Sequence, residues 1–238
     1  MNSIPILMYH NVARAPRGVK LRGLYVSPGR FARQMALLRL LGYRGLSMTA
    51  ALPYLRGEQH GKVAVITFDD GYRDNLENAL PALQRHGFSA TCYVVSKAIG
   101  QYNHWDAEIL GIRKPLMDES ELRAWRAAGM EIGAHGRQHL RLPDCSPAML
   151  EDEIMGSKAD LQDLLGQPVT QFCYPYGAAG PREAQAVQAA GFATAVTVAR
   201  GRARPGTNLF LLPRILVGGH HGPHMLPLQL LSAYEDRR

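Results

Sequence analysis

The chain has 238 residues, of which 46% are hydrophobic and 20% are charged, and its formal net charge is +7. These values are typical of a globular protein with one hydrophobic core, so we expect a single domain over residues 1–238. No run approaches the roughly 20 apolar residues of a transmembrane helix, and the scattered basic residues, with no DNA-binding motif, argue against nucleic acid as a partner.

Short hydrophobic strands alternate with amphipathic helices along the chain. In chain order we expect strand 4–9, helix 27–42, strand 63–68, helix 74–86, strand 90–95, helix 118–128, strand 130–133, helix 146–165, strand 170–174, helix 181–190, strands 192–198 and 210–217, and helix 225–234. This alternation indicates an α/β barrel whose site lies at the carboxyl ends of the strands. An open doubly wound sheet is the alternative, although the chain lacks the glycine-rich nucleotide-binding motifs of many such sheets.

Three cysteines, Cys92, Cys145 and Cys173, are an odd number without CxxC spacing. This pattern argues against a disulfide framework and against a thiolate zinc site, and it suits a reducing compartment. The first residues lack the features of a signal peptide. We therefore expect a cytoplasmic protein, whose basic charge would allow peripheral contact with the inner face of the membrane.

Two adjacent carboxylates, Asp69 and Asp70, follow the strand over 63–68 in the segment TFDDG. Adjacent carboxylates repel each other unless a cation or a shared proton relieves them. A turn at Gly71 would allow both side chains to face the same opening. The Asp-Asp-Gly sequence by itself is also a common surface turn.

Two histidines, His135 and His139, lie four residues apart after the short strand over 130–133. This spacing lets both imidazoles bind one ion, although a surface loop with two solvated histidines is the alternative for the pair alone. Together with Asp70 they form a set of two histidines and a carboxylate. Such a set leaves positions open for water and substrate.

A third motif, Tyr174-Pro175-Tyr176-Gly177, follows the strand over 170–174. The rigid proline and the permissive glycine could fix a turn in which a backbone N–H group points into the site. Taken alone, the motif is an ordinary turn.

The order TFDDG, HxxxH and PYG resembles the polysaccharide deacetylase family, the NodB-type carbohydrate esterases, and the resemblance extends from Ile4 to about Val217. It implies a deformed (β/α)7 barrel that carries one divalent metal ion, zinc or another transition metal. By position it implies that Asp69 is the general base, and that Asp70, His135 and His139 are the metal ligands. The Tyr176 backbone amide would stabilise the oxyanion.

The chain departs from the family pattern at two positions. Gly136 stands where a Ser or Thr usually follows the first histidine, so a hydroxyl that could brace the loop is missing. Cys173 stands where an Arg usually orients the base. Arg214 could take over that function, or it could be a plain surface arginine. The chain also has no DxxDW segment.

The resemblance implies that the general acid is a histidine at the end of an apolar strand. The strand Ile6 to Tyr9 ends at His10, and in a closed barrel the first and last strands are neighbours. This start resembles the branch that deacetylates poly-N-acetylglucosamine, whose members look circularly permuted. We therefore expect His10 to be the acid, with the C-terminal His220, His221 and His224 as the alternative.

The segment Asn103-His104-Trp105-Asp106 lies in a loop between two predicted elements. Asn103, Trp105 and Asp106 are candidates for lining the sugar site. A packed loop anchored by the tryptophan is the alternative reading.

The resemblance therefore implies an N-deacetylase that acts on the acetamide of an N-acetylated amino sugar. The expected substrate is a polysaccharide or, in keeping with the expected location and the basic charge, a polyprenyl-phosphate-linked sugar at the membrane surface. A metal-dependent hydrolase of a non-sugar amide or imide is one alternative. A catalytically inactive carbohydrate-binding protein is another, and the intact set of Asp69, Asp70, His135 and His139 argues against it.

Overall fold

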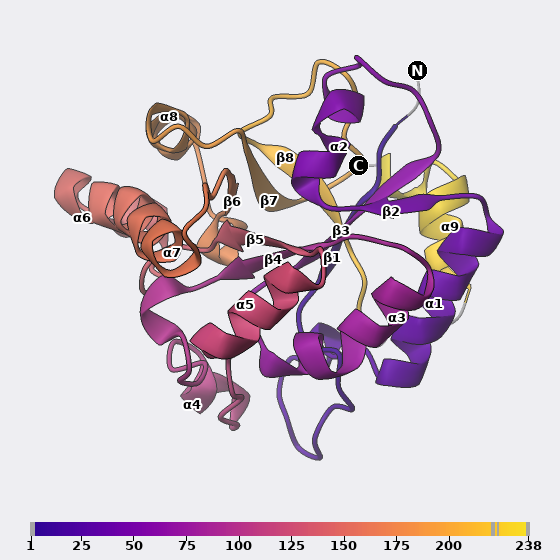
Figure 1. Ribbon diagram of the computed structural model, residues 1–238, viewed down its shortest axis with the longest axis horizontal. Helices are drawn as coiled ribbons and strands as arrows, with labels where there is room; N and C mark the ends of the chain where they lie inside the picture. The colour runs from indigo at the N-terminus through magenta and orange to yellow at the C-terminus, as the bar shows by residue number, and fades with distance from the viewer. Residues whose placement is uncertain (1–2, 220–221, 223, 237–238) are drawn as a thin grey trace.

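A closed parallel sheet forms the centre of the protein (Figure 1). In the computed structural model, which describes residues 3–219, 222 and 224–236, eight strands pair in the order β1-β8-β7-β6-β5-β4-β3-β2. β1 also pairs with β3, from Ile6 opposite Val65 to Tyr9 opposite Phe68. This pairing closes seven strands into a ring, and β2 lies outside it against the first half of β3. The expected deformed (β/α)7 barrel is confirmed.

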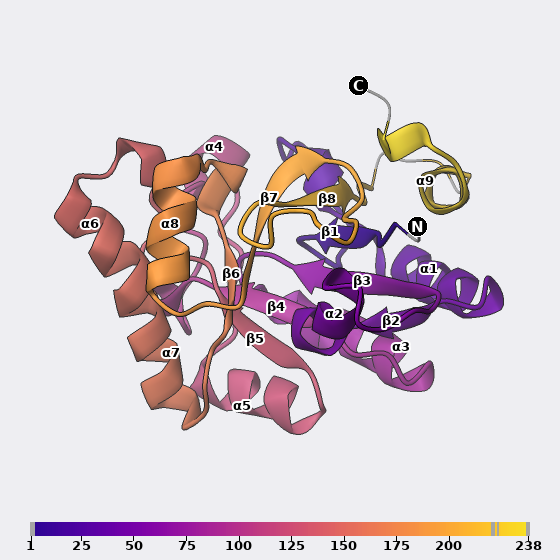
Figure 2. The same ribbon diagram turned by 90° about the horizontal axis from the view of Figure 1, so that it is seen from above.

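The strands and helices have the following bounds. The strands are β1 (Ile6–Tyr9), β2 (Arg44–Leu46), β3 (Val63–Phe68), β4 (Thr91–Val94), β5 (Glu131–Ala134), β6 (Gln171–Cys173), β7 (Thr194–Arg200) and β8 (Leu212–Leu216). The helices are α1 (Pro28–Leu40), α2 (Met48–Leu55), α3 (Leu80–Arg85), α4 (Ala107–Leu110), α5 (Glu119–Ala127), α6 (Pro147–Glu151), α7 (Ser157–Leu165), α8 (Pro181–Ala189) and α9 (Met225–Leu231). Helices α6, α7 and α8 lie on one side of the barrel, and α1, α3 and α9 lie on the other (Figure 1, Figure 2).

The sequence pattern did not predict β2 and α2. β2 has only three residues, so no alternation of polar and apolar residues is visible. Helix α2 contains Pro53, which removes a helical hydrogen-bond donor and ordinarily indicates a break. The helix expected over 146–165 is present but is interrupted by a wider π-type turn, η5 (Asp152–Gly156), between α6 and α7.

Side chains alternate along each strand between the barrel interior and the surrounding helices. Leu7, Ile66 and Ile215 belong to the cluster that contains residues of α1, α3 and α5, whereas Ile6 and Val65 belong to a second cluster, which contains residues of the barrel interior and of α2. Thr67 is two residues after Val65 on the same strand, so its side chain faces the interior as that of Val65 does. Arg214 directly precedes Ile215, whose side chain faces the helices, so the Arg214 side chain faces the interior. Burial of the apolar side chains on both surfaces stabilises the barrel and fixes which residues enter it.

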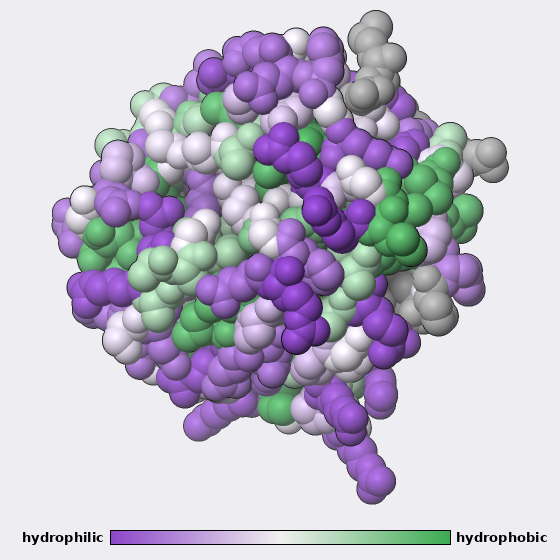
Figure 3. Space-filling model, turned by 45° about the vertical axis from the view of Figure 1, so that its right-hand side comes forward, coloured by the Kyte–Doolittle hydropathy of each residue, from purple (hydrophilic) through white to green (hydrophobic). Residues whose placement is uncertain are grey.

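The surface is predominantly hydrophilic, with smaller hydrophobic areas between the polar residues, on the face that Figure 3 shows. None of the helices in the described part of the chain has both the length and the hydrophobicity to cross a membrane.

Candidate metal and catalytic site

Polar residues from several strands meet at the carboxyl end of the barrel. Asp69 and Asp70 follow β3, His135 follows β5, and His10 follows β1. The backbone continues the strand pairing into this region, because the Asp69 amide donates to the Tyr9 carbonyl at 3.0 Å and the His135 amide donates to the Val94 carbonyl at 2.9 Å. Parallel strands therefore bring these side chains to the same opening.

Asp70, His135 and His139 form a buried group of three donors. Oδ1 of Asp70 lies 3.5 Å from Nε2 of His135 and 3.4 Å from Nε2 of His139. One donor atom from each residue lies within 4.8 Å of the others. Asp70 and His139 have positive φ angles of 75° and 62°, which are uncommon for residues other than glycine. The surrounding structure therefore holds the donors in a conformation that these residues adopt rarely.

The hydrogen bonding of His135 leaves its Nε2 lone pair for the centre of this group. Nδ1 of His135 lies 2.8 Å from the carbonyl oxygen of Cys173, and a carbonyl can only accept. The proton of a neutral His135 is therefore on Nδ1, so Nε2 presents a lone pair toward the Asp70 carboxylate. Burial lowers the pKa of His139 and favours its neutral form. Burial also lowers the pKa of His135, but its interactions with Cys173 and Asp70 outweigh this effect and hold the pKa well above its usual value. A cation between these donors would relieve their mutual repulsion.

Asp69 is held by Arg214, which is 1% exposed and lies in the barrel interior. The guanidinium donates to both carboxylate oxygens, each at 2.7 Å, and Nε donates to the Thr197 carbonyl at 2.7 Å. Burial raises the pKa of Asp69, but the charge and hydrogen bonds of Arg214 outweigh it, so the pKa lies below its usual value. Cys173 lies beside the guanidinium, with Sγ 3.3 Å from Nη2. The small thiol thus leaves room for an arginine from β8.

The His10 ring faces the two carboxylates from the end of β1. Its Nε2 lies 3.9 Å from Oδ2 of Asp69, and its side chain is 16% exposed. The Asn75 side chain donates to the His10 carbonyl at 2.8 Å. Of the C-terminal histidines, His220 and His221 lie outside the described residues, and His224 is exposed where α9 begins.

Two aromatic side chains flank His139. The Trp105 ring stacks on it with centroids 4.6 Å apart and an interplanar angle of 21°, and Tyr176 meets it edge-on at 4.6 Å. Tyr176 has a φ angle of 60° and is 52% exposed. Its backbone amide donates to no backbone group in the described part of the chain.

Asn103 and Asp106 have different environments. Asn103 has no exposed surface, donates to Oδ1 of Asp106 at 2.6 Å and accepts from the Lys114 amide at 2.6 Å. Its side chain thus holds the loop together instead of facing an open site. Burial, and then the charge of Asp70, raise the pKa of Asp106 to about 6.

The raised pKa of Asp106 predicts a pH-dependent stability. The folded, metal-free protein binds more protons than the unfolded chain between about pH 4 and pH 6, so stability should fall as the pH rises through this window. We expect the free energy of unfolding of Asp106→Asn, measured relative to the wild type, to rise by about 1 kcal/mol from pH 4 to pH 8, after allowance for solvent screening. Denaturant unfolding at both pH values measures this difference. An equal effect of the substitution at both pH values would contradict the prediction.

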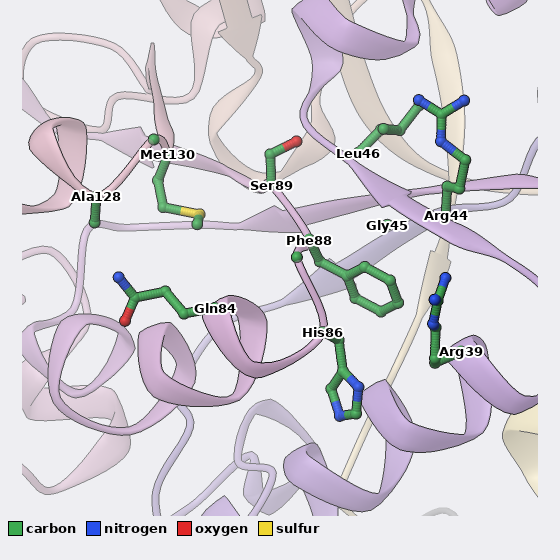
Figure 4. Close-up of a pocket in the computed structure, with 12 residues that line it drawn as sticks. Arg39, Arg44, Gly45, Leu46, Gln84, His86, Phe88, Ser89, Ala128 and Met130 are labelled. Atoms are coloured by element: carbon green, nitrogen blue, oxygen red, sulfur yellow. The ribbon is translucent and has the colours of Figure 1, made fainter.

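A separate cavity of about 570 Å³ lies at the other end of the barrel (Figure 4). Its lining includes Arg44, the first residue of β2, together with Phe88 and Met130, which precede β4 and β5. Because the strands are parallel, these positions lie at their amino ends. The cavity is therefore distinct from the group of carboxylates and histidines.

A buried carboxylate near the histidines, Glu153, was not singled out from the sequence. It is 1% exposed and accepts hydrogen bonds from the backbone amides of Arg137 and Gln138. The available signal was its position on the apolar face of the helical segment, between Leu150 and Ile154, because charged residues are seldom buried without partners.

Comparison with known proteins gives a consistent result. The family model described as polysaccharide deacetylase matches residues 56–195. YxkH of Bacillus subtilis (strain 168), which is named provisionally as a polysaccharide deacetylase, is 28% identical and the match covers 90% of this chain and 71% of that protein. Poly-beta-1,6-N-acetyl-D-glucosamine N-deacetylase of Staphylococcus aureus (strain MRSA252) is 22% identical, over 94% of this chain and 82% of that one. The solved structure of the Streptococcus pyogenes deacetylase PplD in complex with acetate has a TM-score of 0.82 at 25% identity and covers 96% of this chain and 98% of its own.

Proposed function

The chain belongs to the polysaccharide deacetylase family, and from this premise we propose that it is a metal-dependent N-deacetylase acting on an N-acetylated amino sugar. The observation that carries the proposal is the group of Asp70, His135 and His139 beside the Asp69–Arg214 pair. The relative named as a poly-beta-1,6-N-acetyl-D-glucosamine N-deacetylase supports an N-acetylglucosamine polymer as the substrate class.

Asp70, His135 and His139 are the residues that would hold the ion. One carboxylate and two imidazoles suit zinc or another divalent transition metal, and three protein ligands leave positions open. The lone pair that Nε2 of His135 presents to Asp70 supports this fit. When bound, such an ion supplies Lewis acidity, which polarises a carbonyl oxygen and lowers the pKa of water.

Asp69 and His10 divide the proton transfers between them. Asp69 accepts a proton from the water that attacks the acetamide carbonyl, and Arg214 keeps this carboxylate ionised and oriented. As the C–N bond breaks, His10 donates a proton to the amine nitrogen. The products are acetate and a free amino sugar, and Nε2 of His10 lies 3.9 Å from Oδ2 of Asp69, so both groups can reach the same amide.

The remaining residues bind and orient the substrate. The Tyr176 amide, which has no backbone acceptor among the described residues, would donate to the oxyanion as negative charge develops on the carbonyl oxygen. Trp105 and Tyr176 form aromatic walls beside His139, against which a sugar ring can pack. Asn103 contributes indirectly, because it holds Asp106 in the same loop.

The test of this function is acetate release coupled to metal content. We expect the purified protein to bind about one divalent ion per chain and to release acetate from short β-1,6-linked N-acetylglucosamine oligomers. His135→Ala removes one of three ligands, so bound metal should fall below about 0.1 ion per chain at neutral pH. His86→Ala, a change in the cavity at the other end of the barrel, is the matched control and should leave metal content unchanged.

Full metal occupancy in His135→Ala would remove this residue from the ligand set. A metal-loaded wild type that released acetate from no polymeric, polyprenyl-phosphate-linked or nucleotide-linked acetamido sugar would refute the substrate class. Hydrolysis of a non-sugar amide under the same conditions would replace it with the alternative hydrolase.

A further inference from the structure

The loop that carries both histidines is bound from two sides. On one side, the Gly136 and Arg137 carbonyls accept from the amides of Ser96 and Lys97 at 3.2 and 2.9 Å. On the other side, the Arg137 and Gln138 amides have no strand partner and donate to the Glu153 side chain instead. The loop is therefore fixed at its carbonyl groups by backbone and at its amide groups by one carboxylate.

Glu153 makes three short contacts with these amides. Oε2 accepts from the Arg137 amide at 2.9 Å, and the Gln138 amide donates to Oε1 at 3.0 Å and to Oε2 at 3.2 Å. Within the described part of the chain Glu153 forms no salt bridge, although it is 1% exposed. A buried carboxylate without a counter-ion is costly unless hydrogen bonds to its charged form offset the cost. The two loop amides provide those bonds.

Gly136 makes this arrangement possible. Its φ angle is +75°, and a Cβ atom built on it would lie 2.7 Å from Oε2 of Glu153. Any other residue at this position would be strained and would also displace the carboxylate. Gly136 lacks the side-chain hydroxyl usual at this position, and the Glu153 carboxylate, from the π-type turn η5, lies in the space beside it.

The Arg137 side chain reinforces the connection between the loop and this helical segment. Its guanidinium binds Asp160 at 2.9 and 3.1 Å and Asp152 at 2.5 Å. These bonds lie near the surface, where each is worth little. The buried contacts of Glu153 are therefore the stronger constraint on the loop.

We propose that Glu153 is a positioning residue that holds His135 and His139 with both Nε2 atoms facing Asp70 before any ion binds. This inference rests on the proposed metal-dependent function. Holding the ligands in place beforehand lowers the cost of ordering them on binding, so Glu153 should raise metal affinity without touching the ion. Groups that orient metal ligands typically change affinity by about 10–100-fold when they are replaced.

The experiment compares Glu153→Gln with Glu183→Gln. The glutamine at 153 keeps the size of the side chain but places an NH₂ group against the loop amides, so Zn²⁺ affinity should fall by about 10–100-fold. Glu183 is also a buried carboxylate that accepts from a backbone amide, that of Gly180 at 2.7 Å, but it contacts no ligand loop and pairs with Arg182. Glu183→Gln should therefore lower the melting temperature and leave Zn²⁺ affinity unchanged. Competition with a chromophoric chelator measures both affinities.

Hydrogen exchange in the wild type gives a second readout that needs no variant. The Arg137 and Gln138 amides should be protected in the metal-free protein, and addition of Zn²⁺ should change their protection little. Glu153→Asp keeps both carboxylate oxygens on a shorter stem, so its affinity should lie between those of the wild type and Glu153→Gln.

Three results would overturn the inference. They are equal Zn²⁺ affinity in Glu153→Gln and the wild type, an equal loss of affinity in Glu183→Gln, and unprotected loop amides in the metal-free wild type. A wild type that bound no metal would refute the proposed function instead. In that case only the hydrogen exchange of the Arg137 and Gln138 amides would test whether Glu153 holds the loop in place.

Discussion

Asp69→Asn is expected to lower turnover by about 10²–10⁴-fold while the metal remains bound. The asparagine keeps the shape of the side chain but cannot accept a proton from water. The ligands Asp70, His135 and His139 are unchanged, so elemental analysis should still find about one ion per chain. Steady-state acetate release from an N-acetylglucosamine oligomer measures the loss.

The stability of this variant needs a control, because Asp69 is the partner of the buried Arg214. Removal of one member of a buried ion pair typically costs about 3–5 kcal/mol. The double variant Asp69→Asn with Arg214→Met removes the uncompensated charge, so it should regain part of the stability and none of the activity. Turnover near the wild-type value in well-folded Asp69→Asn would exclude Asp69 as the base.

His10→Ala should lower turnover on N-acetylated sugars by about 10²–10⁴-fold and should also leave the metal bound. An amine is a poor leaving group, and it departs much more readily when a nearby acid protonates it. His10 reaches the site from the end of β1, with Nε2 3.9 Å from Asp69. Metal analysis and single-substrate kinetics separate this effect from a loss of the ion.

Comparison of leaving groups makes the assignment of His10 specific. On 4-nitrophenyl acetate, whose leaving group needs no proton, His10→Ala should lose less than about 10-fold, whereas Asp69→Asn should lose about as much as on the amide. The combined His220→Ala, His221→Ala and His224→Ala variant is the matched control and should retain activity. An inactive triple variant together with an active His10→Ala would assign the acid to the C-terminal histidines.

Several features of the protein follow from local sequence alone. Strands such as β3, with its β-branched residues, and helices such as α1, with its Ser27-Pro28 start, depend on contacts within a few residues. The candidate ligands were also visible, because His135 and His139 lie close in sequence and each motif follows a strand. Parallel strands place such positions at one end of the sheet whatever the strand order, so the motifs could be assigned to one site without it.

The positions that depend on contacts distant in sequence were decided only by the tertiary structure. Arg214 could have been a surface residue, and the closure of β1 between β3 and β8 places it inside the barrel against an aspartate 145 residues away. Asn103 looked like a polar residue of an open loop, but its loop folds over it and buries its amide. Glu153 has no motif, and its effect on the histidine loop depends on how η5 packs beside Gly136. Side-chain direction and burial at these sites are set by which elements become neighbours, and local sequence does not encode that choice.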